Sequence, residues 1–226
     1  MCSRYSLTSP PEAVRATFGY DTEVVFPPRY NIAPTQPVAI VRTGLKGTRE
    51  LALVRWGLIP SWSKDPAKLS TLINARSETA AEKPSFRGAL RHRRCLIPAD
   101  GFYEWTGKPG AKQPHLIGLK SGAIMGFAGV WEHWLGADGS EMETAAILTV
   151  AANADMVPIH DRMPLILPEA AFDGWLDCRS GSSVDIQPFL HPPADGLLRI
   201  VAVSRTLNNP RNEGPGVQER VGGALL

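Results

Sequence analysis

The stretch Cys95-Leu96-Ile97-Pro98-Ala99-Asp100-Gly101-Phe102-Tyr103-Glu104-Trp105 contains two short runs rich in β-forming residues, at 95–97 and 102–105. Similar runs occur on both sides of it, at 38–42, 51–56, 115–119, 124–131, 144–150 and 198–203. The segment Gly44-Leu45-Lys46-Gly47 predicts a hairpin between the first two of these. Many strands with few helices predict an α+β fold with a mainly antiparallel, barrel-like sheet core.

Helical patterns are few and short. One begins at Ser9-Pro10-Pro11-Glu12, which predicts a capping box, and ends near Phe18. Others lie at 76–81, 151–156 and 168–176. The proline-rich residues 26–35 predict an ordered loop, and the glycine-rich end from about residue 214 predicts a mobile tail. With 226 residues and no evident linker, we expect one domain over residues 1–226.

Composition excludes several classes of protein. Apolar residues make up 43% and charged residues 20%, as in an ordinary globular chain. No apolar run approaches the roughly 20 residues of a membrane span, and no signal peptide follows Met1. Cys2, Cys95 and Cys178 are scattered, which argues against a disulfide framework or a zinc site. We therefore expect a cytoplasmic protein with no membrane partner.

The charge pattern leaves room for a nucleic-acid partner. The net charge is only +2, but 17 of the 24 basic residues are arginine. The rigid planar guanidinium suits phosphate recognition through two parallel hydrogen bonds, whereas lysine mostly supplies solvated charge. A GC-rich genome would produce the same arginine bias, so any nucleic-acid surface is expected to be a local patch.

Cys2 is the most informative single residue. Cysteine is small enough for methionine aminopeptidase to remove Met1, which would leave Cys2 with a free α-amine beside its thiol. An α-amine has a pKa of about 7.7–8.0, so roughly a tenth of it is uncharged at pH 7. Such an amine attacks an aldehyde to form a Schiff base, and the thiol can close the imine into a thiazolidine. The alternative is a small second residue with no role.

Three further stretches carry candidate chemistry. Strand alternation places Glu104 and Phe102 on one face, and aromatic neighbours would raise the pKa of the Glu104 carboxyl; the alternative is an edge-strand glutamate that reaches water. His160 lies in a loop between two prolines, where it is either an acid–base group or part of a solvated loop. Asn74 is either a helix N-cap or a polar group directed into a site. His115 and His133 are interpreted as structural.

Taken in order, these stretches resemble the SRAP family (SOS response-associated peptidase), whose members shield abasic sites in single-stranded DNA. The resemblance spans residues 1 to about 215. It is carried by the motifs Met1-Cys2-Ser3-Arg4-Tyr5, Tyr30-Asn31-Ile32-Ala33-Pro34, Trp56-Gly57-Leu58-Ile59-Pro60-Ser61-Trp62, Asn74-Ala75-Arg76-Ser77-Glu78-Thr79, Gly101-Phe102-Tyr103-Glu104-Trp105, His160-Asp161-Arg162-Met163-Pro164 and Val203-Ser204-Arg205.

The resemblance implies roles for individual residues. It implies that Cys2 forms the covalent link to the abasic sugar and that Asn74, Glu104 and His160 complete the catalytic set. It also implies DNA contacts, namely phosphate contacts from Arg4, Arg76 and Arg162 and apolar wedges from Trp62 and Pro34. Two departures are Ser3, where the family usually has glycine, and Ser63, where some members carry a second aromatic residue after Trp62.

The expected mechanism follows from this resemblance and from the chemistry of Cys2. His160 opens the sugar ring, the Cys2 amine attacks C1′, Glu104 relays protons, Asn74 orients the reacting groups and the thiol closes the thiazolidine. No metal or cofactor is expected. The resemblance implies a bacterial, nucleoid-associated monomer in the DNA damage response, with single-stranded DNA carrying abasic sites as partner and replication-fork proteins as further candidates.

Two other functions remain open from sequence. Cys2, His160 and Asn74 could form the Cys–His–Asn set of a thiol peptidase or autopeptidase, a hydrolase activity that the family name records. The arginine and tryptophan side chains could serve a non-catalytic binder of single-stranded nucleic acid. The terminal position of Cys2 favours the aldehyde chemistry, because a peptidase needs the thiol but not the amine.

Overall fold

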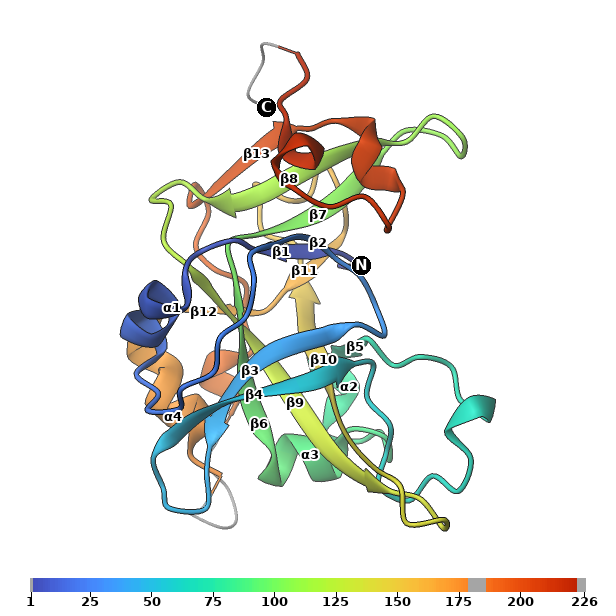
Figure 1. Ribbon diagram of the computed structural model, residues 1–226. Helices are drawn as coiled ribbons and strands as arrows, with labels where there is room; N and C mark the ends of the chain where they lie inside the picture. The colour runs from blue at the N-terminus through green and yellow to red at the C-terminus, as the bar shows by residue number, and fades with distance from the viewer. Residues whose placement is uncertain (1, 179–185, 223–226) are drawn as a thin grey trace.

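The computed structural model describes residues 2–178 and 186–222, and its strands form two sheets (Figure 1). The first sheet has the strand order β13-β8-β7-β1-β2. In chain order its strands are β1 (Tyr5–Leu7), β2 (Arg29–Ile32), β7 (Gly101–Thr106), β8 (Gln113–Leu119) and β13 (Leu198–Ala202).

The second sheet closes into a five-stranded barrel, because β10 pairs with both β4 and β9. The barrel strands are β3 (Pro37–Thr43), β4 (Arg49–Trp56), β6 (Arg94–Ala99), β9 (Met125–Leu135) and β10 (Glu141–Ala151). Three short strands extend this sheet, namely β5 (Asn74–Arg76), β11 (Arg162–Pro164) and β12 (Ile166–Leu167). All six residues of β6 are buried, since it lies between β3 and β9. At Gly129 in β9, a Cβ would come within 2.9 Å of the Ile97 side chain, so only glycine fits there.

The helices are short and lie around the sheets. The α-helices are α1 (Pro11–Phe18), α2 (Ser77–Ala80), α3 (Arg87–His92) and α4 (Phe172–Leu176). The 3₁₀ helices are η1 (Pro66–Lys68), η2 (Glu169–Ala171), η3 (Gln187–Phe189), η4 (Arg205–Asn208) and η5 (Pro215–Gln218). The expected α+β fold with a barrel-like, mainly antiparallel core is confirmed. Two strand pairings are parallel instead of antiparallel, namely β4 with β10 and β5 with β10.

The first helix forms as expected but without the predicted capping box. Pro10 is the N-cap and gives no side-chain cap to the helix. Ser9 instead binds Asp100, through its Oγ at 2.6 Å and its backbone N at 2.7 Å. Asp100 also accepts a hydrogen bond from the Thr8 hydroxyl at 3.0 Å. The prediction was wrong because a carboxylate from the β6–β7 connection takes the Ser9 side chain and anchors the end of β1.

Two local predictions need correction, and one helix was not predicted. Residues 26–35 were expected to be loop, but Arg29–Ile32 forms β2, which pairs with β1. Residues 151–156 were expected to be helical, but they form the end of β10 and a turn in which Asn153 Oδ1 accepts a hydrogen bond from Met156 N at 3.2 Å. The helix α3 had no predicted counterpart.

A second, smaller hydrophobic cluster lies on the face of the first sheet that is directed away from the main core. It is formed by Tyr103, Val203, Leu207 and Val217, all at most 3% exposed. Gln218 Nε2 donates a hydrogen bond to the Tyr103 hydroxyl at 2.7 Å. The tail that was expected to be mobile from about residue 214 therefore has packed contacts in its first part, while residues 223–226 lie outside the described residues.

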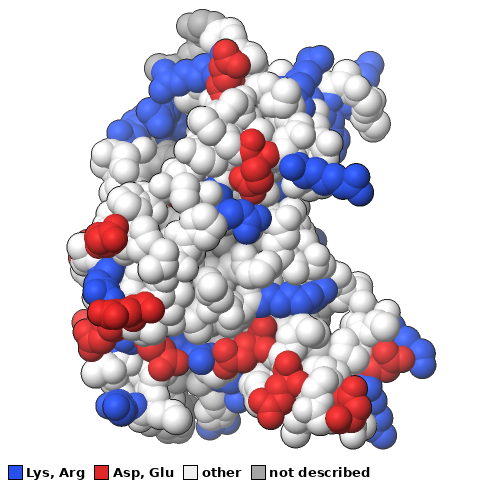
Figure 2. Space-filling view, viewed as in Figure 1, with Lys and Arg blue, Asp and Glu red and all other residues white. Residues whose placement is uncertain are grey.

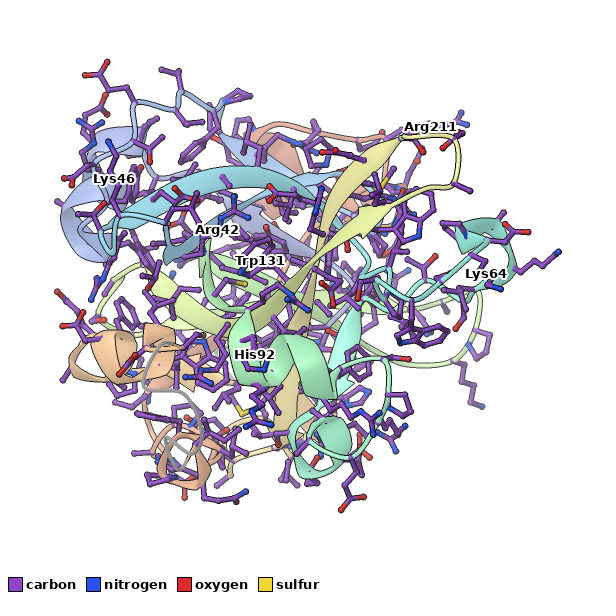
Figure 3. The ribbon with its side chains drawn as sticks, turned by 90° about the horizontal axis from the view of Figure 1, so that it is seen from below. Arg42, Lys46, Lys64, His92, Trp131 and Arg211 are labelled. Atoms are coloured by element: carbon purple, nitrogen blue, oxygen red, sulfur yellow. The ribbon has the colours of Figure 1, made fainter. Side chains whose placement is uncertain are left out.

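A cluster of ion pairs joins the barrel strands β3, β4 and β10. Seen from below, Arg42 of β3 and Trp131 of β9 lie next to each other (Figure 3). The Arg42 guanidinium is 4.0 Å from the centre of the Trp131 ring and pairs with Glu50 and Glu143 at 2.7 and 2.6 Å. Within the described part of the chain, no helix is long and apolar enough to cross a membrane.

Candidate active site

The N-terminal segment carries Cys2 into the interior of the molecule. Cys2 lies three residues before β1, and its side chain is fully buried. Its Sγ is 3.7 Å from the carbonyl oxygen of Arg4, which also accepts a hydrogen bond from Tyr103 N at 3.0 Å. Figure 2 shows the molecule hollowed on the side where Figure 1 places the N-terminus, with Lys and Arg side chains at both rims. The segment that carries Cys2 therefore borders a concave surface with basic edges.

Asn74 contacts Cys2 directly. It begins β5, which runs parallel to β10 with Asn74 opposite Ile147. Its Nδ2 donates a hydrogen bond to the Cys2 carbonyl oxygen at 2.8 Å, and its Oδ1 is buried with no hydrogen-bond partner among the described residues. The N-cap of α2 is Arg76, so the alternative that Asn74 is a helix cap is wrong. Asn74 therefore presents an unused acceptor beside Cys2.

Glu104 lies on β7 and is only 5% exposed. Because β7 lies between β8 and β1, it is an interior strand, and the alternative of an edge-strand glutamate in water is wrong. Burial raises the pKa of the Glu104 carboxyl, while His160 and Lys112 act in the opposite direction. Burial and the Glu104 charge together raise the pKa of the Cys2 thiol, so the thiol stays protonated at neutral pH.

His160 ends the turn that follows β10. Its side chain is 29% exposed, and its Nδ1 lies 2.9 Å from the backbone N of Arg162 and 2.8 Å from Asp161 Oδ1. The amide suits an Nδ1 without a proton, whereas the carboxylate suits an Nδ1 that carries one. Nδ1 thus has a partner in either tautomer of the ring. Its Coulomb interaction with Glu104 shows that these two candidates lie within electrostatic range of each other.

Two of the three candidate phosphate-binding arginines are engaged within the protein. Arg4 Nη1 donates hydrogen bonds to Asn31 Oδ1 at 2.7 Å and to the Leu207 carbonyl at 3.2 Å, and its guanidinium lies 5.7 Å from the centre of the Trp105 ring. Arg76 is exposed, and its side chain makes no hydrogen bond within the described residues, although its backbone pairs with Thr149 of β10. Of the three, Arg76 is therefore the one whose guanidinium is open to a ligand.

Arg162 forms a two-pronged ion pair with Glu78, a residue that the sequence patterns did not single out. The two hydrogen bonds measure 2.5 and 2.9 Å, and Arg162 Nη2 also donates to the Thr149 carbonyl at 2.6 Å. Glu78 follows Asn74 by four residues, and Arg162 follows His160 by two. The pair thus connects the segment that carries Asn74 with the segment that carries His160. No local signal in the sequence joins residues 84 positions apart.

The two candidate wedges differ in exposure. Trp62 is 58% exposed, and its Nε1 donates to the Pro84 carbonyl at 3.3 Å, which fixes the ring edge and leaves a face open. Pro34 is half-buried in a turn whose next residue, Thr35, has a φ of 73°. A β-branched residue with positive φ is strained, and the Thr35 N–H is held by the Trp56 carbonyl at 2.8 Å.

The structure thus brings Cys2, Asn74, Glu104 and His160 together from four separate segments of the chain. No group of three or more His, Cys, Asp or Glu residues that could hold a metal ion occurs in 2–178 and 186–222. These four residues are the ones that the resemblance to the SRAP family implies as a catalytic set.

Comparison with known proteins gives the same assignment, and the chain belongs to this family. The sequence profile described as "SOS response associated peptidase (SRAP)" matches residues 1–210. The chain is 39% identical over 224 residues to the abasic site processing protein YoqW of Bacillus subtilis, covering 97% of this chain and 99% of YoqW. It is 40% identical over 219 residues to the abasic site processing protein YoaM of the same organism, covering 94% and 95% of the two chains.

The solved structures agree with the sequence comparison. A crystal structure of a protein from Bacteroides thetaiotaomicron superimposes with a TM-score of 0.85 at 27% identity, covering 97% of this chain and all of the other. The match extends over both sheets, so the barrel and the five-stranded sheet belong to the shared fold.

Proposed function

We propose that this chain processes abasic sites in single-stranded DNA by forming a covalent crosslink through Cys2 after Met1 has been removed. The names of the relatives, abasic site processing proteins, support the lesion as substrate. The observation that carries the chemistry is the placement of Cys2, whose backbone is held by Asn74 and whose side chain lies beside the buried carboxylate of Glu104.

The reaction begins with opening of the abasic sugar ring. His160 acts as the acid–base group in this step, which generates the open-chain aldehyde. The free amine of Cys2 forms a bond to C1′ and gives a carbinolamine, and Glu104 accepts a proton from the nitrogen. Glu104 returns that proton to the hydroxyl, which leaves as water, and a Schiff base remains. The Cys2 sulfur then bonds to C1′, its proton passes to the nitrogen, and a thiazolidine results. The unused acceptor Asn74 Oδ1 suits a hydrogen bond from the amine or from a sugar hydroxyl.

The DNA contacts are proposed around this centre. Arg76 takes a phosphate directly, because its guanidinium is exposed. Arg162 can bind a phosphate only if it releases Glu78. Arg4 can bind a phosphate only through the N–H groups that do not donate to Asn31 and Leu207. The open face of Trp62 and the rigid Pro34 turn flank the lesion as apolar wedges. Such contacts bind without regard to sequence, as a lesion-binding protein in the DNA damage response requires.

The alternative peptidase function is less well supported by the same geometry. A thiol peptidase needs a thiolate activated by a histidine that an asparagine orients. Here the pKa of the Cys2 thiol is raised, Asn74 binds the Cys2 carbonyl, and His160 Nδ1 faces Arg162 N and Asp161. An amine that acts first does not require a thiolate, so these features favour the aldehyde chemistry.

The test is incubation of the mature protein with single-stranded DNA that carries an abasic site, followed by denaturing gel electrophoresis. We expect a heat-stable adduct from the wild type and from the control Cys178→Ala, which removes a half-exposed free thiol. Cys2→Ala should bind the DNA but give only a Schiff base that borohydride can trap. A heat-stable adduct from Cys2→Ala at the wild-type rate would refute the thiazolidine.

A further inference from the structure

His115 shares a strand pair and a face with Glu104. In the antiparallel pair of β7 and β8, Glu104 stands directly opposite His115, and Phe102 opposite Ile117. Side chains of directly opposed residues point to the same face, with Cβ atoms about 4.5–5.5 Å apart. Phe102 and Ile117 belong to the main core, whereas Tyr103 and Leu116 pack into the small cluster on the other face. The His115 side chain is therefore directed to the face on which Glu104 lies.

The surroundings of His115 leave one of its nitrogens unused. The residue is only 5% exposed, and its Nε2 lies 2.9 Å from Thr106 Oγ1. Its Nδ1 is buried with no hydrogen-bond partner among the described residues. Burial lowers the pKa of His115, so the ring is neutral at pH 7. Because a buried polar atom without a partner costs free energy, we expect a neighbouring group to hydrogen-bond with Nδ1 during function.

A neutral imidazole beside Thr106 can serve both states of a carboxyl group. If the Thr106 hydroxyl donates to Nε2, the proton is on Nδ1, which can then donate to a carboxylate. If the hydroxyl turns and accepts from Nε2, Nδ1 becomes an acceptor for a protonated carboxyl. His115 gains no net proton in either case, and only its tautomer changes.

We propose that His115 is a positioning residue for Glu104: through Nδ1 it donates to the carboxylate and accepts from the carboxylic acid, and so sets the pH range in which Glu104 exchanges protons with the reacting nitrogen. This inference rests on the proposed function. The other charged or titratable groups that act on Glu104 are the terminal amine and, among the described residues, Cys2, His160 and Lys112, and none of these three residues lies opposite it on β8.

The first test compares the pH profiles of adduct formation. His115→Phe keeps a ring of similar size but removes the donor and acceptor, whereas His115→Asn retains an amide near the position of Nδ1. Because the hydrogen bond to the charged carboxylate is stronger than the one from the neutral acid, loss of both should move the acid limb of the rate upward by about 0.5 to 1 pH unit. The rate should then be about 3- to 10-fold lower on the acid side of the wild-type profile and unchanged on its plateau. His115→Asn should restore most of the wild-type profile.

The controls separate this role from folding and from DNA binding. His133→Phe removes a histidine that is 45% exposed and faces Glu141, so its profile should match the wild type. Affinity for single-stranded DNA carrying a tetrahydrofuran abasic analogue, which has no aldehyde, should be unchanged in both His115 variants. If His115→Phe fails to fold, the comparison of His115→Asn with wild type still applies, with a shift of less than about 0.3 pH unit expected.

The second test does not depend on DNA. The His115 ring is titrated by NMR in the wild type and in Glu104→Gln, and removal of the carboxylate should lower the apparent pKa of His115 further. If the wild type forms no adduct, the proposed function is refuted, but the titration still tests the contact between His115 and Glu104. A wild type that forms the adduct, with superimposable pH profiles for His115→Phe and an unchanged titration in Glu104→Gln, would overturn the inference.

Discussion

Replacement of Glu78 by glutamine should destabilise the protein and loosen the site together. Glutamine preserves the shape of the side chain but removes the charge that pairs with Arg162 at 2.5 and 2.9 Å. The Arg162 side chain is 14% exposed and that of Glu78 is 50% exposed. A buried hydrogen bond to a charged group contributes about 1.5–3 kcal/mol and an exposed ion pair less than about 1 kcal/mol. For this half-exposed pair we expect a loss of about 1–2 kcal/mol in the free energy of unfolding.

The loss in the free energy of unfolding caused by Glu78→Gln should be larger at neutral pH than in acid. Hydrogen bonding and the charge of Arg162 lower the pKa of Glu78 in the folded protein. Its contribution to stability is therefore present above the unfolded pKa of about 4.3 and disappears as the pH falls through the lower, folded value. At pH 7 the midpoint of thermal unfolding should drop by about 2–8 °C, and the difference from wild type should vanish in acid.

The assay is thermal or urea unfolding of both proteins from pH 3 to pH 8. Glu141→Gln is a suitable control, because its side chain is 65% exposed and its one polar side-chain contact among the described residues is the exposed ring of His133, so it should change stability by less than about 0.5 kcal/mol. Adduct formation by Glu78→Gln should also be slower, since the pair connects the segments of Asn74 and His160. An equal difference at pH 3 and pH 7 would show that the charge of Glu78 is not responsible.

Three further changes, at Arg76, at Glu104 and at the N-terminal amine, should have measurable effects. Arg76→Ala should lower the slope of log affinity for single-stranded DNA against log salt by about 0.7, while Arg91→Ala on α3 should leave it unchanged; equal slopes for both would refute the Arg76 contact. Glu104→Gln should raise the unfolding midpoint at pH 7 but not below pH 4, because the penalty of a buried carboxylate with a raised pKa appears only when the group is ionised. An N-formylated protein, verified by mass spectrometry, should bind abasic DNA without forming an adduct; adduct formation at the wild-type rate would contradict the amine-first order.

Patterns of short range were predictable from the sequence. Alternation along residues 101–106 correctly separated Glu104 and Phe102 from Tyr103, because side chains on a strand alternate between its two faces. The hairpin of β3 and β4 was also predictable, since its glycines punctuate two β-rich runs. In both cases the information lies within a few neighbouring residues.

Contacts between distant segments could not be predicted in this way. The capping box failed because Asp100, 91 residues away, binds Ser9 more closely than the helix does. The Glu78–Arg162 pair and the parallel pairing of β5 with β10 join segments that are adjacent only after the barrel has closed. The strand β2 forms within a proline-rich stretch because β1 offers it a partner, which overrides the loop propensity of its neighbours. The placement of Asn74 beside Cys2 depends on the same long-range pairing.

The burial of Cys2 has a consequence for the chemical selectivity of the protein. A thiol that is fully buried and has a raised pKa reacts slowly with peroxides, alkylating agents and soluble disulfides, because these reagents need an accessible thiolate. Cys178 is half-exposed, so among the cysteines of the described chain it should be modified first by a thiol reagent. In the proposed mechanism, this burial keeps the Cys2 thiol intact under oxidative stress, and the sulfur reacts only with a substrate that enters the site and forms an imine with the neighbouring amine.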